Sequence, residues 1–64
     1  RGLTERESQV CTYAALGETN KLISYRLGIS QSTVSSTLRS AMRKLGVQNR
    51  AQLVERLRAF RAIA

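Results

Sequence analysis

Apolar residues recur at intervals of three and four along four stretches of this chain, the spacing that places them on one face of an α-helix. No stretch shows a convincing alternation of apolar and polar residues with the period of two that a β-strand requires. Glycine commonly ends a helix, and the stretches are separated by Gly17, Gly28 and Gly46. The pattern therefore predicts an all-α fold of four helices, over about residues 5–16, 20–27, 31–45 and 50–62.

Residues that cap helices stand where these helices are expected to begin. Thr4 and Glu7 have the spacing of a capping box, in which each side chain accepts a hydrogen bond from the backbone N–H of the other. The expected N-caps of the next three helices are Thr19, Ser30 and Asn49, the last with Gln52 as its capping-box partner. We expect the last helix to turn Leu53, Val54, Leu57 and Phe60 toward the core and to turn Glu55 and Arg58 away.

The third predicted helix has two chemically different faces. At about 100° per residue, its apolar stripe consists of Val34, Leu38, Ala41, Met42 and Leu45. The opposite face carries only hydroxyls and guanidiniums, from Ser32, Ser35, Ser36, Arg39 and Arg43. One flank carries Thr33, Thr37, Ser40 and Lys44. A solvated helix face ordinarily mixes acids with bases at i, i+4 spacing, whereas this polar face has no acid.

The distribution of charge supports a partner for that face. Eleven Lys and Arg against four Asp and Glu give a net charge of +7, and no acid occurs between Thr19 and Val54. Short hydroxyl side chains let a helix approach another surface closely, and a guanidinium matches guanine O6 and N7 with two hydrogen bonds. The pattern favours a helix that lies in the major groove of double-stranded DNA, over a basic face that is only solvated.

Other classes of site lack the residues that they need. The chain has no His and a single Cys, so we expect no metal site of the usual ligands and no cofactor. Histidine is also the commonest general base, and capping accounts for Glu5 and Glu7, so we expect no catalytic residues and no enzyme. Cys11 is expected to be a small apolar core residue. No apolar run approaches the roughly 18 residues of a membrane span, and we expect no membrane partner.

Four sequence blocks have the order and spacing of a known family. They are Leu3-Thr4-x-Arg6-Glu7, Gly17-x-Thr19-Asn20-Lys21-x-Ile23, Arg26-Leu27-Gly28-Ile29-Ser30 and Arg43-Lys44-Leu45-Gly46-Val47, and Thr33-Val34, Leu38 and Arg50-Ala51 match as well. From Leu3 to about Leu57 the chain resembles the LuxR-type helix-turn-helix domain of quorum-sensing and NarL/FixJ-type bacterial transcription regulators. The resemblance implies one DNA-binding domain over residues 1–64. We expect it to be the C-terminal fragment of a larger regulator. That regulator is expected in the bacterial cytoplasm, associated with the nucleoid.

The resemblance also implies roles for particular positions. In this family the third helix enters the major groove, and two copies pair on DNA through the last helix. Together with the polar helix face, it predicts base contacts from Ser32, Ser35, Ser36 and Arg39. Phosphate contacts are expected from Thr19, Asn20, Lys21, Thr33, Arg43 and Lys44. The family often has Lys-Val-His where Ser35, Ser36 and Thr37 stand here, so we expect a different base sequence to be read, mainly by Arg39. Leu22 replaces a usual Glu and is expected to be partly exposed.

Two other functions remain open at this point. A sigma-factor region-four domain would contact RNA polymerase as well as a promoter, but the Lys44-Leu45-Gly46-Val47 block and the fourth helix argue against it. Alternatively, the chain is a protein-interaction module whose basic face meets an acidic partner, which a titration with duplex DNA would distinguish. An RNA binder would be expected to expose aromatic residues for base stacking, and the chain has only Tyr13, Tyr25 and Phe60.

Overall fold

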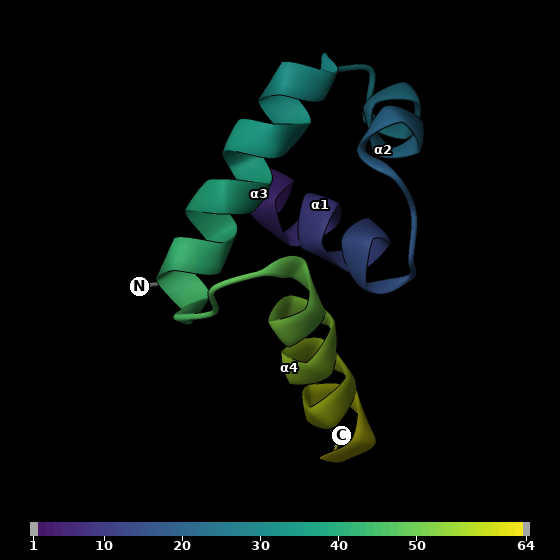
Figure 1. The fold of residues 1–64 in the computed structure, drawn as a ribbon. Coiled ribbons are helices and arrows are strands. Elements are labelled where there is room, and N and C mark those ends of the chain that lie inside the picture. The colour runs from purple at the N-terminus through teal and green to yellow at the C-terminus, as the bar shows by residue number, and fades with distance from the viewer. Residues whose placement is uncertain (1, 64) are drawn as a thin grey trace.

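The computed structural model of the protein describes residues 2–63, and within them the side chains of residues 2–58. Four helices follow one another: α1 (Glu5–Ala15), α2 (Asn20–Leu27), α3 (Gln31–Leu45) and α4 (Arg50–Ile63). In Figure 1, α2 and α3 meet at the top through a short turn, α1 lies in the middle, and α4 follows the loop after α3. The all-α prediction is confirmed, and every predicted helix boundary lies within one residue of the observed one.

The predicted caps begin the first three helices. Thr4 Oγ1 accepts from the backbone N–H of Glu7 at 3.1 Å, and Glu7 Oε1 accepts from that of Thr4 at 2.8 Å, which completes the capping box. Thr19 and Ser30 cap α2 and α3 in the same way, through their hydroxyl oxygens. Each cap satisfies a backbone donor that the helix itself leaves unpaired, so local sequence is enough to fix these helix starts.

The start of α4 differs from the prediction in one hydrogen bond. Asn49 Oδ1 accepts from the backbone N–H of Gln52 at 2.9 Å, as predicted. Gln52 Oε1, however, accepts from the backbone N–H of Gln48 at 2.7 Å instead of from that of Asn49. The prediction of a reciprocal capping box at α4 was therefore wrong in its second half. A Gln side chain is one methylene longer than the Asn it faces, and here its amide reaches one residue further back.

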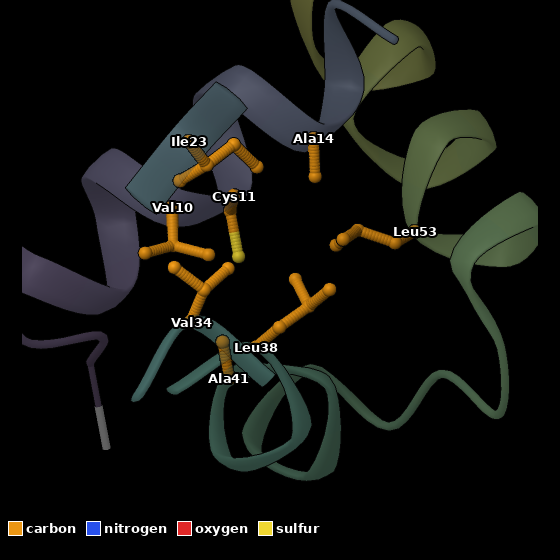
Figure 2. Close-up of a cluster of buried hydrophobic side chains, with 8 residues drawn as sticks. All are labelled: Val10, Cys11, Ala14, Ile23, Val34, Leu38, Ala41 and Leu53. Carbon is orange, nitrogen blue, oxygen red and sulfur yellow. The ribbon is translucent and has the colours of Figure 1, made fainter. Parts of the chain in front are cut away.

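The core is built from one face of each helix. Figure 2 shows its eight buried side chains converging: Val10, Cys11, Ala14, Ile23, Val34, Leu38, Ala41 and Leu53. Full burial of a Val, Leu or Ile side chain stabilises the fold by about 1.5–3 kcal/mol, so this cluster holds the helices together. The apolar stripe of α3 is confirmed, because Val34, Leu38 and Ala41 are buried and Met42 and Leu45 are half-buried. Cys11 is a core residue, and burial raises the pKa of its thiol.

The remaining sequence expectations concern α4, Leu22 of α2 and any membrane span. Leu53 is buried, Val54 and Leu57 are half-buried, and Glu55 and Arg58 are exposed, as expected. The predicted core position of Phe60 lies outside the described side chains. Leu22 is 41% exposed, as its position off the apolar stripe of α2 indicated. None of the described helices combines the length and the apolar character that crossing a membrane demands.

A tight turn between α2 and α3 fixes how α3 is presented. Gly28 ends α2 in the left-handed conformation, with φ of 67°, and the backbone N–H of Ile29 donates to the carbonyl of Ser24. Ser30 then caps α3 after only a three-residue turn. Because the buried stripe of α3 packs against α1, the polar face of α3 points away from the rest of the domain.

Candidate nucleic-acid interface

The polar face of α3 is uncovered. Its five residues, which we call the outer face of α3, are all exposed: Ser32, Ser35, Ser36, Arg39 and Arg43. All five stay exposed although the Asn20 amide contacts Ser35, so the face is available to a partner along about three turns of helix. The sequence predicted this division between buried and exposed faces from periodicity alone.

Three cations of the helix-turn-helix are without a partner among the described residues: Arg39 and Arg43 on this face, and Lys21 in the first turn of α2. Lys21, Arg39 and Arg43 have exposed side chains, and among the described residues none of them has a hydrogen-bonded or ionic partner. Arg26 differs, because its Nε lies 2.6 Å from Glu18 Oε1 and its guanidinium lies over the ring of Tyr13. The Glu18 carboxylate also raises the pKa of Arg26. Lys21, Arg39 and Arg43 are therefore available to a polyanion, whereas Arg26 is already paired within the domain.

Both helix starts of the helix-turn-helix carry exposed hydroxyls. Thr19 Oγ1 accepts from the backbone N–H of Leu22 at 3.2 Å. Ser30 Oγ accepts from the backbone N–H of Thr33 at 3.1 Å and lies 2.9 Å from the Thr33 hydroxyl. The N-terminal turn of a helix carries partial positive charge and N–H groups that favour a phosphate. Thr19 and Thr33 thus lie where a backbone phosphate contact is chemically reasonable, and their contacts with DNA stay a prediction.

Asn20 and Ser35, predicted for different roles, are brought together. Asn20 Nδ2 lies 3.2 Å from Ser35 Oγ, which links the start of α2 to the outer face of α3. On its other side, Asn20 Oδ1 accepts from Nη1 of Arg50 at 2.7 Å. Arg50 also donates through Nη2 to the backbone carbonyl of Glu18. The first residue of α4 therefore holds the first residue of α2 in place.

Sequence reasoning gave Arg50 no role. A base in the first turn of a helix is unfavourable with the helix dipole, but this was only a weak signal of a compensating partner, because Lys21 has a similar place in α2 without a partner among the described residues. The partner itself, Asn20, is 30 residues away in sequence, and only the fold brings the two together.

Lys44 is occupied within the domain. Its Nζ lies 2.9 Å from Glu7 Oε1, and the Ser40 hydroxyl donates to Glu7 Oε2 at 2.8 Å. Glu7 is only 6% exposed, and its pKa is lowered to about 2 by the Thr4 backbone N–H first and then by Lys44 and Ser40. The Lys44 side chain remains 36% exposed, and an ammonium has three donors, so one contact with Glu7 leaves donors for a phosphate. Sequence reasoning accounted for Glu7 by capping and missed this second role.

Comparison with known proteins gives one matching family and several relatives. The model of a family described as bacterial regulatory proteins, luxR family, matches residues 1–57. The HTH-type transcriptional activator RamA of Corynebacterium glutamicum is 43% identical over 61 residues, which are 95% of this chain and 22% of RamA. The spore germination protein GerE of Bacillus subtilis is 42% identical over 55 residues, which are 86% of this chain and 74% of GerE.

A third relative is similar over a comparable stretch. The glycerol metabolism activator of Pseudomonas putida is 37% identical over 54 residues, which are 84% of this chain and 24% of that activator. The chain thus spans about a quarter of the length of RamA and of the glycerol activator. No solved structure matches the chain significantly.

Proposed function

The chain belongs to the LuxR family of bacterial regulatory proteins, whose helix-turn-helix binds DNA to regulate transcription, and from this we propose that α3 lies in the major groove and reads the bases of an operator. The observation that carries the proposal is the outer face of α3, which is exposed, free of acid and opposite a buried apolar stripe. Such a face fits closely between phosphate backbones and supplies donors to base edges.

Arg39 is the main reader in this proposal. It lies in the middle of α3, is exposed, and has no partner among the described residues. Its fork of donors suits the two acceptors of guanine in the major groove. The shorter side chains of Ser32, Ser35 and Ser36, which precede Arg39 along α3, contact neighbouring base edges.

Phosphate contacts position α3 in the groove. We assign them to residues around the outer face: Thr19, Asn20, Lys21, Thr33, Arg43 and Lys44. Lys21 and Arg43 have the most freedom for this role, because no described residue pairs with either of them. Each phosphate neutralised by a cation releases condensed counterions, so binding should weaken steeply as the salt concentration rises.

Pairing on DNA is the second element of the proposal. The described part of α4 turns Gln52, Glu55 and Arg58 outward, and a small polar surface of this kind supports only weak association. We therefore propose a domain that is monomeric alone and forms a homodimer through α4 on a two-fold operator. Light scattering tests this directly: a tight dimer without DNA would contradict it.

The setting of the domain follows from its relatives. RamA is named as a transcriptional activator, and the matched segment is 22% of its length. We propose that this domain likewise supplies the DNA-binding part of a larger regulator, which acts in the bacterial cytoplasm.

The test is a selection of duplexes from a random pool by the 64-residue chain, followed by fluorescence anisotropy with the enriched sequence. We expect one enriched motif that is bound at least 1,000-fold more tightly than a scrambled duplex of the same length, as is typical of specific regulators. Equal binding to enriched and scrambled duplexes would favour the alternative, a basic face that meets an acidic protein.

A further inference from the structure

Ser35 differs from the other serines of the outer face of α3, because its hydroxyl is already bonded within the domain. Asn20 Nδ2 lies 3.2 Å from Ser35 Oγ, and Arg50 Nη1 lies 2.7 Å from Asn20 Oδ1. The three residues come from three helices and form what we call the Arg50–Asn20–Ser35 chain. Ser35 stands where the family often has a lysine, and a serine there is shorter and uncharged.

The direction of each hydrogen bond in this chain is fixed by Arg50. A guanidinium can only donate, so the atom of the Asn20 amide that faces it must be the acceptor Oδ1. The other end of the amide, Nδ2, then faces Ser35 and can only donate. A reversed amide would place its NH₂ group against the guanidinium and lose the hydrogen bond with Arg50, although Ser35 could then donate to its oxygen. Ser35 Oγ is therefore an acceptor within the domain.

That leaves the proton of the Ser35 hydroxyl for something outside the domain. Other serines use their proton internally: Ser24 donates to the carbonyl of Lys21, and Ser40 donates to Glu7. For Ser35, no acceptor occurs among the described residues. A hydroxyl that accepts a hydrogen bond also becomes a better donor, because hydrogen bonds in series polarise one another.

We propose that Arg50 and Asn20 bias Ser35 toward donating to DNA, because one of its two lone pairs is already occupied, so that Ser35 favours a base edge that presents an acceptor in the major groove. This inference rests on the proposed function, in which the outer face of α3 meets base edges. Suitable acceptors are guanine O6 and N7, adenine N7 and thymine O4, whereas the cytosine amino group is a donor and is disfavoured. Ser32 and Ser36 have no such partner among the described residues, so their hydroxyls turn to donate or accept and discriminate less.

The first part of the test locates the base that Ser35 contacts. Affinities of the wild-type chain and of Ser35→Ala are measured for every single-base-pair variant of the enriched duplex. At one position we expect the wild type to prefer acceptor edges over cytosine by about two- to tenfold, the range of one neutral hydrogen bond. Ser35→Ala should remove that preference and leave the preference at the Arg39 position intact. An equal loss on every duplex would place Ser35 on a phosphate and overturn the proposal.

The second part of the test reverses the direction of the hydrogen bond between Asn20 and Ser35. Asn20→Asp keeps the size of the side chain and its acceptor for Arg50, but it replaces the donor that faces Ser35 with an acceptor. The Ser35 proton then turns inward, and its lone pairs face the DNA. We expect a uniform loss of affinity from the added negative charge, and, at the Ser35 position alone, a shift of preference toward the amino groups of cytosine and adenine.

Arg50 variants supply the matched comparison. Arg50→Gln lets the Asn20 amide turn over and should weaken the preference at the Ser35 position, whereas Arg50→Lys retains a donor and should preserve more of it. Far-ultraviolet circular dichroism verifies that each variant is folded. An unchanged base preference in Asn20→Asp would overturn the inference. A wild-type chain without any sequence preference would instead contradict the proposed function, and this inference with it.

Discussion

The ammonium of Lys44 lies 2.9 Å from Oε1 of Glu7, which joins the last turn of α3 to the first turn of α1. The same carboxylate accepts from the Thr4 backbone N–H and from the Ser40 hydroxyl. Glu7 therefore caps one helix and anchors another, and its charge is satisfied although it is nearly buried. This arrangement makes both the stability of the domain and the role of Lys44 testable.

Stability should depend on pH through Glu7. Its pKa is about 2 in the folded domain, against an ordinary value of 4.5, because the Thr4 N–H, Lys44 and Ser40 favour the carboxylate. A lowered folded-state pKa stabilises the fold above about pH 4.5, and that stabilisation is lost as the pH falls from 4.5 toward 2. Glu7→Gln should have a lower unfolding midpoint at pH 7, and its midpoint should change less with pH between 4.5 and 2. The unfolding midpoint of both proteins is measured by circular dichroism at each pH. If the two midpoints changed with pH in parallel, this role for Glu7 would be contradicted.

Substituting Lys21 and Lys44 should distinguish a lysine that only binds DNA from one that binds DNA and also stabilises the fold. Lys21→Ala should lower the slope of log affinity against log salt by about one and leave the unfolding midpoint unchanged, because Lys21 is exposed and unpaired among the described residues. Lys44→Ala should lower the slope similarly and also lower the midpoint, because it leaves the Glu7 carboxylate short of a partner. A slope that stays the same in either variant excludes a phosphate contact at that residue.

Substitutions of Gly46 test whether its left-handed backbone conformation is what ends α3. It has φ of 73°, the left-handed conformation, and a Cβ built there would meet nothing within 4 Å. Gly46→Ala should therefore destabilise the domain only through backbone strain, by about 1 kcal/mol. Gly46→Asn should cost less, because asparagine tolerates this conformation better. If denaturant unfolding gave equal losses for the two variants, backbone strain would not be the cause.

The fold could be predicted because its signals are local. Thr4, Thr19 and Ser30 each bond to a backbone amide three residues further on, so the start of a helix is encoded within one turn. The buried stripe and the outer face of α3 follow from a single period along 15 residues. Both kinds of signal depend on sequence separation alone, and neither requires knowledge of how the helices pack.

The polar contacts between helices could not be predicted in the same way. Lys44 and Glu7 are 37 residues apart, and Arg50 and Asn20 are 30 apart, so their meeting depends on how four helices pack. The sequence therefore identified Lys44 and Asn20 as surface residues for DNA, without the internal partners that orient them. Gln52 shows the same limit at short range, because the reach of its side chain decided which amide it bonds.

The most direct measurement of the central claim compares Arg39→Ala and Arg39→Lys on the enriched duplex and on its single-base-pair variants. If α3 reads bases through Arg39, Arg39→Ala should lose about 1–3 kcal/mol on the enriched duplex and lose discrimination at one position. Arg39→Lys keeps the charge without the fork of donors, so it should retain most binding to scrambled DNA while discriminating less at that same position. An equal loss of affinity on every duplex, with discrimination unchanged at all positions, would contradict the claim.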